Sequence, residues 1–352
     1  MSTTMVYVPA ADPEVRRSGI GSSDAAVVAG LNRWKTPLDL YLEKRGLVEP
    51  EPAGEAAEWG TILEPVLLRE FARRNGVNVV GRGEHGVPVC YCADGVVIPA
   101  AEITEAVALL DTLRHPEHEW MMCHLDGVAL SPVDREVVGV VEAKTTSEHR
   151  SGEWGDSDDA IPEEYIVQTQ HALEIVRAIL GRAVPAYVPV LIGGQRWRQY
   201  TVHHDAELVA SLIEIEREFW RRVEDGNPPP AEPDERGAKA LAKLYPQHDE
   251  GREIVAEPGS ELEALARQLA DAKAALADAE LRVTAAENAI KERMAEAAKV
   301  VGAGFSVTWK TQSRRTVDYR ALIEELNVPA ELIEKHTRES ATRVFRFAWK
   351  GV

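Results

Sequence analysis

Two apolar runs joined by a short polar stretch constrain the fold of this chain more than any other feature. Trp120–Leu130 and the valine-rich Glu136–Lys144 are typical of strands, and Ser131–Arg135 carries the proline and aspartate that punctuate paired strands. With Asp134 at the centre and no bulge, residues at equal distances from Asp134 face each other. The pattern therefore predicts an antiparallel hairpin.

The same pairing brings charged side chains together at the open end of the hairpin. Asp126 faces Glu142, and because side chains alternate along a strand, Lys144 shares the face of Glu142 while Ala143 points away. Opposed Cβ atoms lie roughly 5 Å apart, and two carboxylates that close repel unless a cation lies between them. Mg2+ takes carboxylate oxygens, so the arrangement indicates a metal site. The alternatives are a solvated Glu–Lys ion pair and an Asp-Gly turn.

The charge of the chain does not decide whether it binds nucleic acid. A formal net charge of −18 over 352 residues argues against such a partner. The acidic residues cluster, however, in segments 49–58, 153–164, 214–235 and 249–263, which leaves basic residues elsewhere to form a local patch. The length allows one large core and an accessory domain.

Cysteine usage and hydropathy indicate a cytoplasmic protein. The three cysteines, Cys90, Cys92 and Cys123, are an odd number and fall short of the four thiolates of an iron–sulfur cluster. We therefore expect buried free thiols and no cluster. No apolar run is long enough to span a membrane, and no signal peptide is recognisable.

A glycine- and serine-rich turn precedes an apolar helix near the start of the chain. The turn, GIGSSD, follows Arg16 and Arg17. Free backbone N–H groups at a helix start bind anions, and arginine contacts phosphate in a bidentate manner. The alternative is a plain N-cap supplied by Ser22, Ser23 or Asp24.

A carboxylate interrupts the apolar face of the helix predicted over Glu58–Asn75. Glu64 lies among leucine, isoleucine and valine residues at helical spacing. Its burial is costly unless it is paired or binds a metal ion. Pairing with Arg69 or Arg73 is the alternative to a metal site.

Four further residues are candidates for the site. Gln168 and Gln170 lie early in a helix that Pro162 opens, and an amide both donates and accepts hydrogen bonds. His124 shares a strand face with the hairpin acids, although imidazole is not the ligand that Mg2+ prefers. Trp34, in a turn between two predicted helices, fits a packing role better than base stacking.

Apolar runs outside the hairpin predict the rest of a sheet and its covering helices. We expect strands at 77–80, 87–91, 184–192 and 196–202, and helices at 162–180 and 206–225.

Six sequence blocks follow one another in a fixed order: GIGSSDAAVVAGLNRWKTPLDLYLEKRG, EWGTILEPVLLREFARRNG, HLDGVAL, VVEAKTT, IPEEYIVQTQHALEI and FWRRVEDGNPPP. In these blocks, over about residues 14–230, the chain resembles the YqaJ-type viral recombinases, phage alkaline exonucleases similar to the lambda exonuclease. The resemblance implies an α/β (α+β) fold with a PD-(D/E)xK restriction-endonuclease-like core, a central mixed sheet flanked by helices.

The resemblance also assigns roles to the residues singled out above. The implied catalytic set is Asp126, Glu142, Lys144 and Gln168, and the implied ligands of Mg2+, or of Mn2+, are Asp126, Glu142, the backbone carbonyl of Ala143 and Glu64. The implied grip on a DNA 5′-phosphate consists of Arg16, Arg17, Ser22 and Ser23. Trp34, His124 and Gln170 are auxiliary candidates.

The implied activity is 5′→3′ digestion of duplex DNA from free ends, which leaves single-stranded 3′ overhangs for phage-type homologous recombination. The implied setting is the cytoplasm of a bacterial or phage-infected cell, with a homotrimeric assembly and a single-strand annealing protein as partner. Two alternatives stay open. One is an endonuclease or structure-specific nuclease on the same fold. The other is a non-catalytic DNA-end or partner-binding protein that works through its C-terminal helix.

The last third of the chain differs from the rest. A triple proline ends the nuclease region, and beyond it Leu262, Leu269, Leu276, Val283 and Ile290 recur every seventh residue with alanine at most intervening positions. This heptad pattern implies a close partner, which is a second helix, another subunit or the nuclease body. The predicted organisation is a leader (1–15), a nuclease domain (16–230), a linker (231–259), a long heptad helix (260–299) and a small basic α+β unit (300–352).

Overall fold

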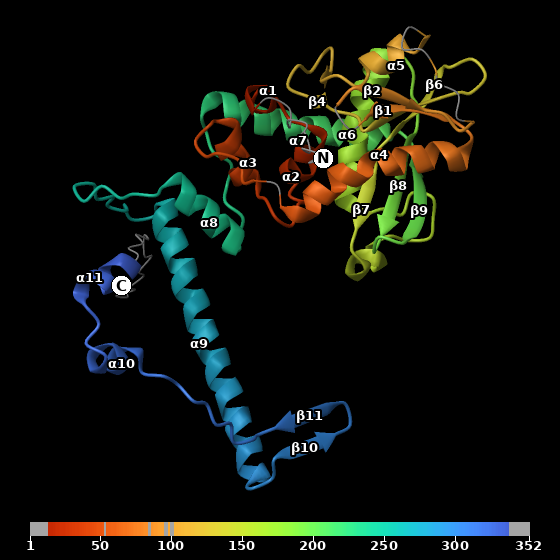
Figure 1. The fold of residues 1–352 in the computed structure, drawn as a ribbon. Coiled ribbons are helices and arrows are strands. Elements are labelled where there is room, and N and C mark those ends of the chain that lie inside the picture. The colour runs from red at the N-terminus through yellow and green to blue at the C-terminus, as the bar shows by residue number, and fades with distance from the viewer. Residues whose placement is uncertain (1–12, 53, 84–85, 95–97, 99–101, 338–352) are drawn as a thin grey trace. The chain divides into compact units, whose positions relative to one another are not determined.

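The chain divides into two compact units, Met1–Tyr245 and Pro246–Val352. Figure 1 shows the computed structural model, which describes residues 13–52, 54–83, 86–94, 98 and 102–337. Most of the predicted leader and the final predicted strand residues, Phe345, Phe347 and Trp349, lie outside the described residues. Among the residues described, no helix is long and apolar enough to cross a membrane.

The first unit is built on a seven-stranded mixed sheet in the order β2-β1-β5-β6-β8-β7, with β9 also paired to β8. Strands β6 and β7 run parallel to β8, and the other pairs are antiparallel. The predicted mixed sheet is therefore confirmed. The strands are β1 (Asn78–Arg82), β2 (Pro88–Tyr91), β5 (Gly127–Leu130), β6 (Val137–Val141), β7 (Lys144–Thr146), β8 (Ala186–Ile192) and β9 (Arg196–Val202).

Helices α4 (Glu55–Asn75) and α6 (Glu163–Leu180) cover opposite faces of this sheet (Figure 1). Phe71 of α4 belongs to one buried cluster with Val79 of β1, whereas α6 packs in a second cluster that contains Val80. Neighbouring strand residues point to opposite faces, so the two valines separate the two halves of the core. The predicted flanking helices are thus confirmed.

The central hairpin has the predicted register at its open end. Val128 pairs with Val140 as expected from a centre at Asp134. Towards the turn the register shifts, so that Leu130 pairs with Val137. The assumption of no bulge is therefore wrong near the turn, where the extra residue is accommodated. The open end keeps the predicted alignment.

Two paired glycines let α4 approach the sheet closely. Gly81 of β1 pairs with Gly127 of β5, and a Cβ atom on Gly127 would lie 2.9 Å from Leu68 Cδ2 and 3.0 Å from Val79 Cγ1. Leu68 is fully buried above them. Glycine is needed here because α4 occupies the space that a side chain would take.

The first half of the predicted strand Trp120–Leu130 does not join the main sheet. Met122 N donates to Ile20 O at 2.9 Å, and β4 (Met122–Cys123) pairs with β3 (Leu113–Arg114) in a separate two-stranded sheet. The prediction of one continuous strand is therefore wrong. Met122 takes its backbone partner from the N-terminal segment, whereas β5 takes its partner from β1.

A third hydrophobic cluster joins the N-terminal helices to the end of the first unit. It contains Ile20, Leu40, Phe219 and Ala240, all buried. Ala240 belongs to α8, which lies inside the predicted linker 231–259. The description of this segment as a linker is wrong up to Leu244, because its small apolar face packs against the first unit. The helices concerned are α2 (Ser22–Val28), α3 (Pro37–Lys44), α7 (Ala206–Asp225) and α8 (Glu235–Leu244).

Three short elements complete the first unit: α1 (Pro13–Arg17), α5 (Thr104–Ala108) and a 3-10 helix at Glu148–Glu153. All three cysteines are free. Cys123 is buried as predicted, but Cys90 and Cys92 are only partly buried, with their Sγ atoms 3.4 Å apart.

The second unit contains the long helix α9 (Glu261–Met294) and a small α+β part. The helix ends at Met294, earlier than the predicted 299, and Lys299 already belongs to a strand. Only Met294 of α9 is buried. The remaining elements are β10 (Lys299–Gly302), β11 (Phe305–Thr308), α10 (Tyr319–Glu325) and α11 (Ala330–His336).

We predict that Gly127→Ala destabilises the first unit by about 1–3 kcal/mol, because the added methyl overpacks the contact with Leu68. Urea denaturation measures the effect. Gly152→Ala is the matched control, since a Cβ atom there meets nothing within 4 Å, and we expect it to stay within about 0.5 kcal/mol of the parent. Equal midpoints for the two variants would contradict the close approach of α4.

A second prediction concerns Glu174 of α6, which is buried and bonded to Arg177 and to the imidazoles of His115 and His204. Burial acts to raise the pKa of Glu174, but hydrogen bonds from Arg177 at 2.6 and 2.8 Å and from His204 at 2.7 Å outweigh it and bring the pKa to about 2. A carboxyl whose pKa falls on folding stabilises the fold above its ordinary pKa and loses this contribution as the pH falls towards the folded value.

Glu174→Gln should therefore lower the free energy of unfolding at pH 7 by on the order of 2 kcal/mol. The gap to the parent should close between pH 4.5 and about 2. Denaturation at several pH values measures this, with Glu163→Gln, an exposed carboxylate of the same helix, as the control. A gap that persists unchanged at pH 3 would count against the ion-pair account.

Candidate functional site

The open end of the β5–β6 hairpin brings two acidic residues together. Gly127 pairs with Val141, so Asp126 and Glu142 are the next neighbours outward. Asp126 Oδ2 accepts a hydrogen bond of 2.8 Å from Ala143 N. The backbone beyond β6 thus turns a donor towards the carboxylate, which fixes the position of Asp126 beside the following strand.

Lys144 closes a triangle of hydrogen bonds on the same face. Its Nζ donates to Glu142 Oε1 at 2.6 Å and to Gln168 Oε1 at 3.2 Å. Gln168 Nε2 donates to Glu142 Oε1 at 2.6 Å. Lys144 Nζ also lies 4.8 Å from the centre of the Tyr165 ring, a cation–π contact. The structure therefore brings together Glu142, which directly follows β6, Lys144 of β7 and Gln168 of α6.

Glu64 supplies a third acid from α4, one helical turn before Leu68. Burial and the charge of Glu142 raise the pKa of Glu64 to about 7. Burial, followed by the charges of Glu142 and Glu64, raises the pKa of Asp126 well above its ordinary value. Burial disfavours the charge of Lys144, but Glu142 and Asp126 outweigh this effect and raise its pKa. The site therefore carries excess negative charge that a cation would relieve.

The acids open into a cleft of about 660 Å³. Its lining includes Glu64, Asp126, Glu142 and Gln168, together with Arg16, Ser22 and Ser23 from the N-terminal segment. Residues far apart in the sequence thus share one concave surface. Such a concentration of groups with shifted pKa values in a cleft is typical of functional sites.

The N-terminal residues differ in how free they are to bind a ligand. Arg17 is held by Glu49, with its guanidinium 3.0 and 3.1 Å from the two carboxylate oxygens, and it does not line the cleft. Arg16 is exposed there. Ser22 Oγ is buried and has no hydrogen-bond partner among the described residues. Arg16 and the two serines therefore line the cleft, whereas Arg17 is bonded to Glu49 and lies outside the lining.

Asp24, not a serine side chain, completes the start of α2. Its Oδ2 accepts from Gly21 N at 3.1 Å and from Lys44 Nζ at 2.6 Å. The capping alternative is thus fulfilled by Asp24, which leaves the hydroxyl groups of Ser22 and Ser23 for other contacts.

The donors of the cleft fit a hard divalent cation. Carboxylate oxygens and a backbone carbonyl are the ligands that Mg2+ and Mn2+ prefer, and the coupled acids need a positive charge. Within the described residues, no three acidic, histidine or cysteine side chains are spaced as a finished metal cage. Glu142 is bonded to Lys144 instead, so the ammonium group supplies the nearest positive charge.

Comparisons with known proteins agree with the resemblance. Residues 13–178 match the model of the YqaJ-like viral recombinase domain. A Bacillus subtilis relative, described as uncharacterized protein YqaJ, is 30% identical over 331 residues, which cover 92% of this chain and 89% of the relative. The chain belongs to the YqaJ family.

Solved structures with distant similarity to this YqaJ-family chain include two exonucleases. An alkaline exonuclease from Laribacter hongkongensis, LHK-Exo, has a TM-score of 0.40 and 16% identity over 66% of this chain and 97% of its own. A putative exonuclease from Eubacterium rectale has a TM-score of 0.35 and 12% identity over 75% of this chain and 98% of its own.

The auxiliary candidates have different surroundings in this member of the YqaJ family. His124 lines the cleft, with Nε2 2.7 Å from Thr112 Oγ1. Burial, followed by the charges of Arg82 and Arg16, lowers its pKa. A neutral imidazole at the rim of the cleft fits hydrogen bonding better than binding to a phosphate by charge.

Gln170 and Trp34 do not line the cleft. Gln170 is buried, and its amide donates to His203 O at 2.7 Å and accepts from Asp205 N at 2.9 Å. It holds the start of α7 in place. Trp34 is 82% exposed, so its predicted packing role is wrong: the turn that carries it lies on the surface.

Arg82, which ends β1 and lines the cleft, is not among the predicted site residues. Its guanidinium donates to Leu110 O at 2.6 Å and to Gly86 O at 3.0 Å. Thr112, which directly precedes β3, lies in the same lining. The available signal was an arginine at the end of an otherwise apolar strand, at the edge that also carries the acids.

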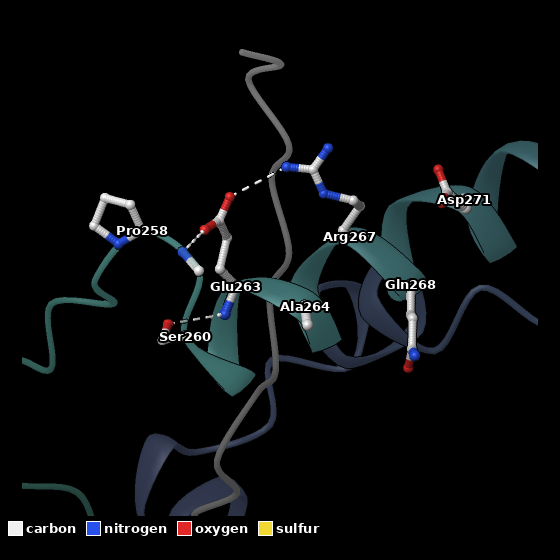
Figure 2. A pocket seen from close by; sticks show the side chains of 8 residues that line it. Pro258, Ser260, Glu263, Ala264, Arg267, Gln268 and Asp271 are labelled. Carbon is white, nitrogen blue, oxygen red and sulfur yellow. Dashed lines mark hydrogen bonds and ion pairs between the residues drawn. The ribbon is translucent and has the colours of Figure 1, made fainter.

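A second hollow, of about 630 Å³, lies in the second unit at the start of α9 (Figure 2). Glu263 accepts there from Gly259 N at 2.6 Å and forms an ion pair with Arg267 at 3.1 Å. Ser260 caps the helix through Glu263 N. These groups satisfy one another as helix caps, so the hollow offers no counterpart to the acids of the first unit.

Proposed function

We propose that the first unit is a metal-dependent deoxyribonuclease that digests duplex DNA from free ends in the 5′→3′ direction and leaves 3′ overhangs for recombination. The observation that carries the proposal is the convergence of Asp126, Glu142 and Lys144 at one hairpin end, where the two acids line a cleft, in a chain of a viral recombinase family. A homotrimer and an annealing-protein partner remain predictions.

The proposed metal ligands are Asp126, Glu142, the carbonyl of Ala143 and Glu64. When bound, Mg2+ or Mn2+ supplies charge neutralisation at the scissile phosphate and a water molecule of lowered pKa. Ala143 N–H holds Asp126 in place through its 2.8 Å hydrogen bond. This hydrogen bond orients an acid that its neighbours would otherwise repel.

Lys144 and Gln168 are proposed to act on the phosphate and the attacking water. The ammonium group of Lys144 stabilises negative charge that develops on the phosphoryl oxygens. Gln168 can accept from water through Oε1 and donate through Nε2. Both side chains already meet at Glu142, so a small rearrangement releases them towards a substrate.

The proposed grip on the 5′-phosphate consists of Arg16, Ser22 and Ser23. A guanidinium and two hydroxyl groups fit the acceptor oxygens of a terminal phosphate. All three line the cleft that contains the acids. Arg17, bonded to Glu49, is left out of this set.

We predict that Mg2+ stabilises the parent chain and not the Asp126→Asn variant. At about ten times its Kd, a bound ion raises the free energy of unfolding by about 1.4 kcal/mol. Asparagine keeps an oxygen for Ala143 N–H but removes the charge. Melting curves with and without millimolar Mg2+ measure the shift, and His124→Gln is the control. A full shift in Asp126→Asn would exclude this acid as a ligand.

Lys144→Ala should slow digestion of linear duplex DNA by roughly a hundredfold or more, because one preorganised charge at the phosphate is lost. DNA binding, measured in Ca2+, should persist. Lys239→Ala, an exposed lysine of α8, is the matched control, and circular dichroism checks that both variants fold. Undiminished digestion by Lys144→Ala would show that the assignment is wrong.

The choice of substrate separates the proposed polarity from the alternatives. The parent should digest 5′-phosphorylated linear duplexes faster than 5′-hydroxyl duplexes and leave covalently closed circles intact. Cutting of closed circles would identify an endonuclease on the same fold. Binding without digestion of any substrate would identify the non-catalytic protein.

A further inference from the structure

Helix α9 carries an apolar stripe that the rest of the second unit, within the residues described, leaves largely exposed. Leu276 in its middle is 59% exposed, and of the 34 residues of α9 only Met294 is buried. Helices in water owe most of their stability to the packing of an apolar face, and exposed apolar patches mark interaction surfaces. The stripe consists of Leu262, Leu269, Leu276, Val283 and Ile290.

The sizes of the side chains favour one orientation for a second copy of the helix. Between the large residues of the stripe lie alanines, including Ala272, Ala279 and Ala286. In a parallel pair each position meets itself, so alanine would face alanine and leave gaps beside facing leucines. In an antiparallel pair the large positions meet the small ones. Interdigitation of large and small residues fills the space.

One antiparallel register uses nearly the whole helix. With Leu276 level with Ala279 of the second copy, Leu269 meets Ala286 and Val283 meets Ala272. Two layers towards each end lack an alanine: Leu265 meets Ile290, and Leu262 meets Arg293. A helix of this length, 34 residues, spans about 50 Å, so the pair would form a continuous seam.

The charges beside the seam select the same register. Lys273 of one copy then lies beside Glu280 of the other, twice by symmetry. Neither residue has an ion-pair partner among the residues that the structure describes. Sliding one helix by a heptad would set Lys273 against Lys273 in one direction and Glu280 against Glu280 in the other. In the second case Glu287 would face Lys273, but Glu287 is already paired with Lys291 at 3.0 Å. Like charges in such positions are destabilising.

The charges that could serve a parallel pair are already occupied within their own helix. Arg282 is 3.0 Å from Asp278, and Glu287 is 3.0 Å from Lys291. An Arg282–Glu287 bond between parallel copies would have to compete with both. The ion pairs therefore favour the antiparallel orientation, as the packing does.

We propose that α9 is a self-association surface, through which two copies of the chain pair as an antiparallel two-helix coil. Leu276 packs on Ala279 of the second copy, and Lys273 pairs with its Glu280. The proposal is independent of nuclease activity, and it is tested without any assay of DNA digestion.

Leu276→Glu in the full chain should halve the mass of the assembly measured by sedimentation, because it places a charge in the seam. Leu281→Glu is the matched control. Leu281 is also an exposed leucine of α9, at 71%, but it lies off the stripe, so the mass should not change. Circular dichroism confirms that α9 still forms. An equal mass for the parent and Leu276→Glu would overturn the proposal.

A charge exchange tests the orientation. Lys273→Glu alone and Glu280→Lys alone should each weaken association by roughly tenfold in Kd, because two attractive contacts become repulsive. The double exchange should restore the parent affinity. In a parallel pair these two residues do not meet, so the absence of restoration would overturn the antiparallel register.

Another part of the same chain could cover the stripe instead. Leu276→Glu would then lower the melting temperature while the mass stays constant. That result would also overturn the proposal, and it would assign α9 to an intrachain contact.

Discussion

Mutual repulsion among Glu64, Asp126 and Glu142 is the constraint on which the first unit depends. Burial, followed by the charge of Glu142, raises the pKa values of Glu64 and Asp126. Folding therefore holds together groups that repel one another. Two local hydrogen bonds oppose the repulsion: Ala143 N–H donates to Asp126, and Lys144 donates to Glu142. A fold that retains such charge at a cost in stability is typical of a site kept for function.

The rest of the unit provides the rigidity that this repulsion requires. Helix α4 presses on the sheet through Leu68, over a pair of glycines, and α6 covers the opposite face. Glu64 and Gln168 are therefore delivered to the hairpin end from opposite faces of the sheet. Because each helix is anchored in its own buried cluster, neither can withdraw its polar residue without disturbing a core.

The sequence predicted the hairpin end because only local rules were needed there. Strict alternation and a recognisable turn fix which residues face each other, so Asp126 and Glu142 could be paired from their distances to Asp134 alone. The bulge near Leu130 escaped prediction because nothing in the local pattern requires it. The acids nevertheless pair as predicted, because the turn is centred between Val133 and Asp134 and the extra residue in β6 makes up the difference.

Other features depend on contacts between distant segments, which a pattern of apolar residues does not reveal. Helix α8 was read as a linker because its buried face is small, and only the cluster around Ala240 shows its partner. Arg82 lines the cleft, and its guanidinium donates to the carbonyl oxygen of Leu110, in a later segment of the chain. Trp34 shows the reverse error, since an aromatic residue suggested a packing role where the turn faces solvent.

The two units require different numbers of chains in an assembly. An antiparallel coil uses two copies of α9, whereas the trimer predicted for the first unit uses three copies of its own surface. Both demands are met together only if the number of chains is a multiple of six, so that every coil finds a second copy and every first unit finds two neighbours. A simple trimer would leave at least one stripe uncovered, and an exposed stripe of leucine and isoleucine favours further association. If both contacts form, the long helix therefore makes a closed three-chain ring an incomplete assembly.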